Sequence, residues 1–332
     1  MRFVLCGLYG GGAAALSNAA NQGEDKAMTA LRIASLLASA TEIVCALGAR
    51  DRLVARSHEC DFPVDVADLP AVTAPKLDTS RRSIDIDRDV KALLEQALSV
   101  YKVEADRLRD LKPDLVVTQT QCEVCAVSEN DVVAALSSWT GTKPEIVSLR
   151  PDGLADIFAD IGRVAAAIGC VKEGAALAAA MKTRLDAVAA RTAALPKPRV
   201  ACIEWIEPLM AAGNWMPELV ALAGGENLFG EAGKHSPWLT IQQIVAADPD
   251  IVIVLPCGFD IQRCREEMPA LAAKKEWRGL RAVRGGHLYL TDGNQYFNRP
   301  GPRLADSLEI LAEILHPQRF SFGCSGKAWV RG

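Results

Sequence analysis

Histidine, cysteine and glutamine residues come directly after two segments that have the pattern of buried strands. Segment 53–56 is followed by His58 and Cys60. Segment 114–118 is followed by Gln119, Gln121, Cys122 and Cys125. In open α/β sheets, ligands bind just beyond the carboxyl ends of the strands. The sequence therefore predicts that both segments border one ligand-binding cleft.

Metal binding is one chemistry that these side chains could provide. A set of one histidine and three cysteines suits tetrahedral zinc or an iron–sulfur cluster, and the candidates are His58, Cys60, Cys122 and Cys125. The spacing of Cys122 and Cys125 also fits a redox-active disulfide. The same side chains could instead contact an organic ligand directly or have a purely structural role in the loop. The sequence leaves all four roles open.

Strand-like and helix-like segments alternate along the chain, which is typical of α/β folds with parallel sheets. Segment 111–117 is echoed by segment 247–253, and in both a proline separates a helix from a buried strand. We therefore expect two Rossmann-like α/β lobes joined by a long linking helix. The expected boundaries are an extension or weak export signal at 1–30, an N-terminal lobe at 31–150, the linking helix at 151–170, a C-terminal lobe at 171–317 and a tail at 318–332.

Composition narrows the class of protein. The chain of 332 residues has a net charge of −4, so it offers no basic surface for nucleic acid. No window approaches the roughly 18 apolar residues of a membrane span. Several of the ten cysteines lie in apolar runs, as buried free thiols do. We expect a cytoplasmic protein, with a periplasmic location as the alternative if residues 1–27 direct export.

Several segments resemble a known family. They are 33–43, 111–116, 213–219, 224–229 and 299–304. As a set they resemble the substrate-binding proteins of ABC importers for cobalamin and iron-siderophores, whose two lobes are bridged by one rigid helix. The motifs around Cys60, Cys122 and Cys125 resemble those of a subgroup of cobalamin-binding proteins. The resemblance implies a periplasmic-binding-protein-like fold without enzymatic activity.

A cobalamin or related corrinoid bound between the lobes is the ligand that the resemblance implies. Neutral imidazole is a good metal ligand, so His58 could coordinate the cobalt. Large aromatic side chains suit a flat macrocycle, and an arginine could pair with the ligand periphery or with a carboxylate of the fold. Ser39 and Glu42 have the spacing of a helix capping box. The expected ligand-binding residues are Ser39, Thr41, His58, Cys60, Gln119, Gln121, Trp205, Trp215, Phe259, Phe297 and Arg299.

The resemblance also implies docking onto an ABC permease through one acidic residue on each lobe. Asp106 matches the first position, whereas Gln242 stands where the family has a glutamate. The loss of that charge puts the permease partner in doubt. The alternative function is a cytoplasmic metal or iron–sulfur protein, with or without redox activity, that uses His58, Cys60, Cys122 and Cys125 on the same scaffold.

Overall fold

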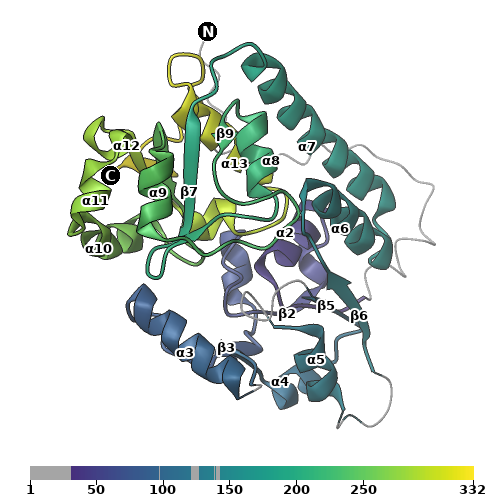
Figure 1. Cartoon of the computed structure of the whole chain (residues 1–332). Helices are drawn as coiled ribbons and strands as arrows, with labels where there is room; N and C mark the ends of the chain where they lie inside the picture. Colours follow the sequence, from purple (N-terminus) through teal and green to yellow (C-terminus); the bar gives the residue numbers. More distant parts are fainter. Residues whose placement is uncertain (1–30, 97, 121–126, 138, 140–142) are drawn as a thin grey trace.

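The computed structural model describes residues 31–332, apart from residue 97, segment 121–126, residue 138 and segment 140–142. Figure 1 shows two α/β lobes, with the N-terminal strands and helices below and the C-terminal ones above. Each lobe contains its own sheet. The structure confirms the predicted α/β class and the two-lobed arrangement.

The N-terminal lobe is built on a parallel sheet in the order β2-β1-β5-β6. Its strands are β1 (Ile33–Ser35), β2 (Leu53–Arg56), β5 (Leu115–Gln119) and β6 (Glu145–Leu149). Its helices are α2 (Ala38–Ala46), α3 (Ser83–Glu95), α4 (Ala105–Asp110) and α5 (Glu129–Leu136). A separate antiparallel pair joins β3 (Thr73–Pro75) to β4 (Tyr101–Val103). This pair supports the loop that follows β2.

The C-terminal lobe has a mixed sheet in the order β12-β11-β10-β7-β8, with β9 also paired to β7. Its strands are β7 (Arg199–Trp205), β8 (Met210–Ala211), β9 (Glu226–Asn227), β10 (Ile251–Val254), β11 (Leu288–Thr291) and β12 (Trp329–Arg331). Strands β8 and β12 run antiparallel to their neighbours, and the other pairings are parallel. Its helices are α8 (Met216–Leu222), α9 (Ile241–Ala247), α10 (Ile261–Ala272), α11 (Lys275–Gly279), α12 (Arg281–Arg284) and α13 (Leu304–Leu315).

The repeated proline segments form the same hook in both lobes. The Asp114 carboxylate accepts a hydrogen bond from the backbone N–H of Arg32 at 2.8 Å, and the Asp250 carboxylate accepts one from Arg199 at 2.8 Å. The Arg32 side chain donates to the carbonyl oxygen of Leu111, directly after α4. The Arg199 side chain likewise donates to the carbonyl oxygen of Ala247, at the end of the helix 241–247. The residue before each proline has a left-handed backbone, with φ of 44° at Lys112 and 39° at Asp248. The sequence echo therefore corresponds to a structural repeat that aligns two neighbouring strands.

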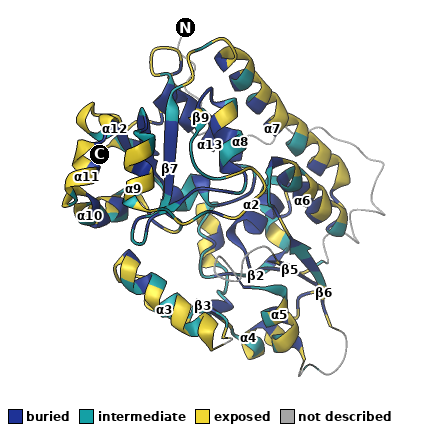
Figure 2. Ribbon diagram, in the orientation of Figure 1, coloured by how far each residue is buried: buried dark blue, intermediate teal, exposed yellow. Residues whose placement is uncertain are grey.

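Two antiparallel helices connect the lobes. They are α6 (Leu154–Ala167) and α7 (Val171–Thr192). Helix α6 contributes Leu154 to the core of the C-terminal lobe and Ile161 to that of the N-terminal lobe. Gly174 allows the two helices to approach closely, since a Cβ there would lie 2.4 Å from the Cβ of Ala165. Figure 2 shows that α7 exposes one face to solvent whereas β7 is buried. Helices α6 and α7 therefore both brace the two lobes.

The end of the chain, expected to be a tail, belongs to the C-terminal lobe. Strand β12 pairs with β11, and Trp329 is buried against Tyr289. The buried carboxylate of Glu313 accepts hydrogen bonds from the backbone N–H groups of Phe322, at 2.6 Å, and Ser325, at 3.0 Å. It also accepts one from the indole N–H of Trp329 at 3.1 Å. A single side chain of α13 thus anchors the segment that leads into β12.

The capping box predicted at Ser39 and Glu42 is wrong, although a capping box does form at the start of another helix. Thr240 and Gln243 form a capping box at the start of α9. Ser39, however, lies inside α2, whose first turn begins after Leu37, and its hydroxyl has no hydrogen-bond partner among the described residues. Glu42 is unavailable for capping because its carboxylate binds arginines of the other lobe. In the described ranges, no helix has the length and apolar character needed to cross a membrane.

Candidate functional site

The carboxyl ends of the strands in the two lobes face each other. In the N-terminal sheet, β1 lies between β2 and β5, so the carboxyl ends of β2 and β5 flank the start of α2. In the C-terminal sheet, the segment that follows β11 contains the π-helical turn η3 (Gly293–Phe297) and then Arg299. Hydrogen bonds join Arg299 to Asp61, which follows β2. Strand-end segments from both lobes therefore meet at one seam.

An ion pair between Asp61 and Arg299 forms the first part of this seam. The two side chains make a bidentate contact, at 2.5 Å from Nη1 to Oδ1 and 3.1 Å from Nη2 to Oδ2. Gln295 also donates to Asp61, at 3.2 Å. Burial alone would raise the pKa of Asp61, but the hydrogen bonds and charge of Arg299 outweigh it and hold that pKa below its usual value. Both groups are thus charged at neutral pH.

A second, more deeply buried pair joins Glu42 of α2 to Arg303, which precedes α13. Arg303 Nε lies 2.8 Å from Glu42 Oε2, and Nη2 lies 2.5 Å from Oε1. The exposed fractions are only 3% for Glu42 and 7% for Arg303. Burial raises the pKa of Glu42, against the opposing influence of Arg303 and Arg299. The guanidinium of Arg303 also lies 4.0 Å from the ring centre of Phe62, a cation–π contact.

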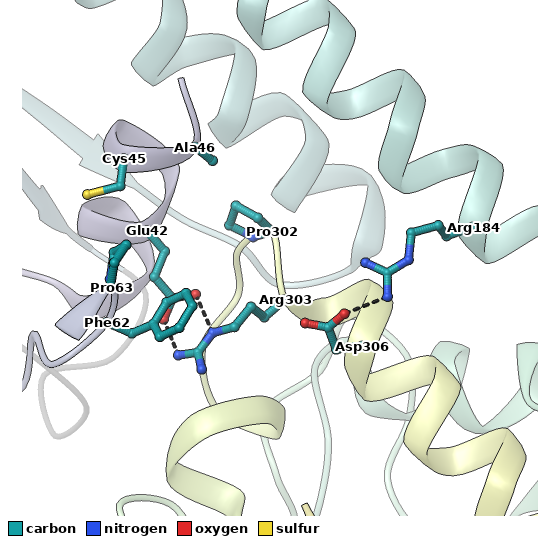
Figure 3. Close-up of a pocket in the computed structure, with 9 residues that line it drawn as sticks. All are labelled: Glu42, Cys45, Ala46, Phe62, Pro63, Arg184, Pro302, Arg303 and Asp306. Atoms are coloured by element: carbon teal, nitrogen blue, oxygen red, sulfur yellow. Dashed lines mark hydrogen bonds and ion pairs between the residues drawn. The ribbon is translucent and has the colours of Figure 1, made fainter. Parts of the chain in front are cut away.

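A small cavity lies behind this pair, where α2, α7 and α13 converge (Figure 3). Its volume is about 100 Å³. Ligand pockets generally have volumes of about 300–1,000 Å³, so this cavity is too small for a macrocycle. Its charged groups are already paired, since Arg303 binds Glu42 and Arg184 binds Asp306 at 2.5 Å. The cavity is therefore a packing gap at the seam rather than the ligand site.

A second contact between the lobes joins α3 to α10. The hydroxyl of Ser83 donates to the Glu267 carboxylate at 2.8 Å, and the Ser83 backbone N–H donates to it at 3.2 Å. Arg263, on the same helix as Glu267, pairs with that carboxylate at 2.7 Å and also donates to the carbonyl of Arg81. A carboxylate at a helix N-terminus is favoured by the helix dipole. Glu267 of one lobe therefore caps α3 of the other, and we call the Ser83–Glu267 contact the latch.

Removing the latch should loosen α3 from the C-terminal lobe. We expect Glu267→Ala to lower the free energy of unfolding by about 2–3 kcal/mol, because hydrogen bonds to a buried charged group are lost. Amide hydrogen exchange in α3 should accelerate more than exchange in α2, whose contacts with the other lobe are unchanged. Urea unfolding and exchange measured by mass spectrometry check the two expectations.

Glu266 provides the matched control for the latch. It is the neighbour of Glu267 on α10, its side chain is 53% exposed, and its nearest contact with Arg263 is 3.7 Å. Glu266→Ala should change stability by less than about 0.5 kcal/mol, as exposed ion pairs generally do. Equal effects of the two substitutions on α3 would contradict the assignment of the latch to Glu267.

His58 and Cys60 occupy different environments although they are two residues apart. The ring of His58 is partly exposed, and its Nδ1 lies 2.7 Å from the hydroxyl of Thr73. Burial, with the charge of Arg56, lowers the pKa of His58, which keeps the imidazole neutral. Cys60 is 1% exposed and accepts a hydrogen bond from Thr41 at 3.0 Å. Burial raises the pKa of the Cys60 thiol to about 11, so this side chain is a neutral thiol rather than a thiolate ligand.

Glu59 and Tyr101 complete the surroundings of His58. The Tyr101 hydroxyl donates to Glu59 Oε1 at 3.3 Å, and the rings of Tyr101 and His58 lie 5.6 Å apart. Burial raises the pKa of Glu59 to about 7. The side chain nevertheless keeps 37% of its surface exposed. Glu59 is therefore a carboxyl group that can change its charge near neutral pH at the edge of the seam.

The predicted aromatic residues divide into two groups. Trp205, at the end of β7, is partly exposed and lies 5.2 Å from the ring of Phe259. Phe259 is buried, and the guanidinium carbon of Arg263 lies 4.9 Å from the centre of its ring. Trp215 and Phe297 are instead packed in the core of the C-terminal lobe, where the Trp215 indole N–H donates to the Phe297 carbonyl at 3.0 Å. Of the four, Trp205 presents the largest accessible ring near the strand ends.

The remaining predicted residues are placed only in part. Gln119 is buried at the end of β5, and Ser39 and Thr41 are buried in α2. Gln121, Cys122 and Cys125 lie outside the described residues. Among the residues that the structure describes, no group of three or more histidine, cysteine or acidic side chains has the geometry to hold a metal ion. His58 and Cys60 are bound to different hydroxyl groups, so these two predicted ligands do not converge.

Comparison with known proteins assigns the fold to a family. The family model for periplasmic binding proteins matches residues 33–295. The chain belongs to this family. A vitamin B12-binding protein of Vibrio vulnificus is 24% identical over 288 residues, which cover 85% of this chain and 89% of that protein. As a member of this family, the binding protein has no enzymatic activity and takes a small-molecule ligand.

Solved structures show the same fold. A periplasmic vitamin B12-binding protein of Vibrio cholerae superposes with a TM-score of 0.61 and 22% identity, covering 86% of this chain and 96% of that one. A periplasmic heme-binding protein of Pseudomonas aeruginosa gives a TM-score of 0.67 and 21% identity, covering 87% and 93%. The fold therefore accommodates more than one kind of metal-containing macrocycle among its relatives.

Several residues of the seam and of the latch were missed by sequence reasoning. They are Glu42, Glu59, Asp61, Ser83, Glu267 and Arg303. Arg299 was predicted to pair with a ligand or with a carboxylate of the fold, and the structure shows the carboxylates of Asp61 and Glu42. A signal was present in the pair Arg299 and Arg303, two cations on a proline-rich segment ahead of an apolar helix. Their acidic partners were not recognisable because they lie more than 200 residues away.

Proposed function

We propose that this protein binds cobalamin or a related corrinoid between its two lobes and serves as the substrate-binding protein of an ABC importer. One observation carries the proposal: strand-end segments from both lobes meet at one seam. His58 lies beside this seam, and Trp205 offers an accessible aromatic ring at the end of β7. The vitamin B12-binding relatives support the choice of ligand, because they span nearly the whole of both lobes.

A neutral ligand decorated with amide groups suits the chemistry of the seam. The charged side chains that join the lobes, Glu42 with Arg303 and Asp61 with Arg299, already satisfy one another. An anionic ligand such as a ferric siderophore would need cations that are free of such partners. A corrinoid instead offers a broad flat face for aromatic contact and a metal with axial positions.

Titration of the purified chain with hydroxocobalamin tests the proposal. We expect saturable binding with a dissociation constant in the micromolar range or below, seen both as heat and as a change in the visible spectrum. Hemin and a ferric siderophore serve as parallel ligands. Binding of hemin without binding of any corrinoid would reject the proposal in favour of a heme-binding role. Metal analysis of the freshly purified protein tests the zinc and iron–sulfur alternative, for which Cys122 and Cys125 lie outside the described residues.

An ABC permease is the proposed macromolecular partner. Asp106 stands in the first turn of α4 with 85% of its side chain exposed, paired with Arg109 at 2.5 Å. Gln242 is also exposed, on α9 of the other lobe, but carries no charge. The docking surface that we propose is therefore acidic on the N-terminal lobe alone. The location of the protein in the cell stays a prediction, cytoplasmic or, if residues 1–27 direct export, periplasmic.

A further inference from the structure

The imidazole of His58 is held in one orientation by a hydroxyl group on β3. Thr73 Oγ1 lies 2.7 Å from His58 Nδ1 and 3.0 Å from the His58 backbone nitrogen. The same hydroxyl donates its own proton to Ser57 Oγ at 3.0 Å. The backbone N–H of His58 donates to Thr73 Oγ1. With the Thr73 proton directed to Ser57 Oγ, the same oxygen also accepts from Nδ1, and this tautomer leaves a lone pair on Nε2.

The other ring nitrogen of His58 is accessible. Nε2 lies 3.9 Å from Glu59 Oε1, which is too far for a hydrogen bond, and it makes no other polar contact within the described part of the chain. A quarter of the side-chain surface, 25%, is exposed. Thr73 itself is buried and held in the β3–β4 pair, so the anchor is rigid. The structure thus presents an oriented nitrogen lone pair directly after β2.

This arrangement is the one by which proteins prepare a histidine to bind a metal. Ligating histidines generally donate their second ring N–H to an oxygen, which fixes the tautomer and orients the lone pair. Cys60 does not compete for the metal, because it is buried and its sulfur accepts a hydrogen bond from Thr41. His58 lies one residue before Glu59, whose carbonyl accepts from Arg299 of the other lobe at 3.4 Å. The lone pair therefore stands beside the seam between the lobes.

We propose that His58 Nε2 ligates the metal of the bound macrocycle at an axial position. This inference rests on the proposed function and narrows its ligand to macrocycles whose metal has a replaceable axial group. In the exchange, the imidazole nitrogen donates its lone pair to the metal and an axial water leaves as water. An axial hydroxide leaves as water after it takes a proton from solvent. The oxidation state of the metal does not change.

Cobinamide is the probe that tests this ligation, because it lacks the nucleotide base that could itself supply an axial nitrogen. The wild-type chain should shift the visible bands of diaquocobinamide on binding. His58→Ala should bind it at least tenfold more weakly and without that shift. Thr73→Val, which removes the anchor of the ring, should weaken binding by about 10–100-fold, as the loss of such a supporting hydrogen bond does. His287→Ala, at an exposed histidine that precedes β11, is the matched control and should behave as wild type.

A second measurement needs no substitution. Cobalt(II) cobinamide bound to the wild-type chain should show nitrogen splitting in its electron paramagnetic resonance spectrum. That splitting should change from a triplet to a doublet when the histidines are labelled with ¹⁵N. Cobinamide that binds with neither the spectral shift nor nitrogen splitting would overturn the axial role of His58 and leave corrinoid binding intact. A chain that binds no corrinoid at all would overturn the proposed function, and the axial ligation with it.

Discussion

Arg303→Ala is expected to lower the free energy of unfolding by about 3–5 kcal/mol, the usual cost of removing one partner of a buried ion pair. The substitution leaves the Glu42 carboxylate, which is 3% exposed, without its bidentate partner. Arg299 is the remaining cation, at 3.4 Å, and it is already committed to Asp61. Because the pair joins α2 to the segment before α13, the loss should also weaken the seam between the lobes. Urea unfolding measures the change.

Two further variants separate the charge effect from simple truncation. Lys182→Ala breaks an exposed pair with Asp186 on α7, whose side chains are 68% and 64% exposed, and should cost less than about 1 kcal/mol. Glu42→Leu combined with Arg303→Met replaces both charges by apolar groups of similar size. This double variant should recover most of the stability lost in Arg303→Ala, because no unpaired charge stays buried. A double variant as unstable as Arg303→Ala would show that packing, and not the unpaired carboxylate, dominates.

Glu313→Ala is expected to lower the free energy of unfolding by about 3–5 kcal/mol, because each hydrogen bond to a buried charged acceptor contributes roughly 1.5–3 kcal/mol. The carboxylate accepts from the backbone N–H groups of Phe322 and Ser325 and from the indole of Trp329. Without it, the segment that leads into β12 loses its anchor. Amide hydrogen exchange across residues 322–331 should therefore rise more than exchange in β10. Thermal unfolding and exchange measured together check both parts.

The conservative change at the same position refines this expectation. Glu313→Gln keeps the size of the side chain and one acceptor oxygen, but it turns an NH₂ group towards N–H donors. Its free energy of unfolding should therefore fall between that of wild type and that of Glu313→Ala. Glu276→Ala, at an exposed position on α11, is the control and should change stability by less than about 0.5 kcal/mol. Unchanged exchange in residues 322–331 of Glu313→Ala would refute the anchoring role.

Local sequence patterns were sufficient for the class of fold. Strand β2 (Leu53–Arg56) has the bounds of the predicted segment 53–56. The echo of 111–117 in 247–253 predicted a repeated lobe, and each copy forms the same hook through Asp114 or Asp250. The hook joins residues 82 and 51 positions apart, but its proline-and-aspartate pattern and the periodicity of burial are each written in short stretches of sequence. Neither needs knowledge of the partner lobe.

The interactions that hold the lobes together depend on distant residues. Ser39 and Glu42 have capping-box spacing, yet the Glu42 carboxylate pairs with Arg303, which is 261 positions away. Trp215 has the features of a ligand-binding aromatic, yet it packs in a core with Phe297. A buried charge must find an opposite charge wherever the fold places one, and sequence spacing carries no record of that choice.

By itself, then, the sequence determined the α/β class, the repeat and the position of His58 directly after β2. Only the tertiary structure decided that the Nδ1 of His58 is anchored by Thr73, that the seam is closed by Glu42–Arg303 and Asp61–Arg299, and that β12 completes the second sheet. The physical reason is the range of the forces. Periodicity and capping act within a few residues, whereas burial of charge and completion of a sheet edge depend on groups brought together by the whole chain.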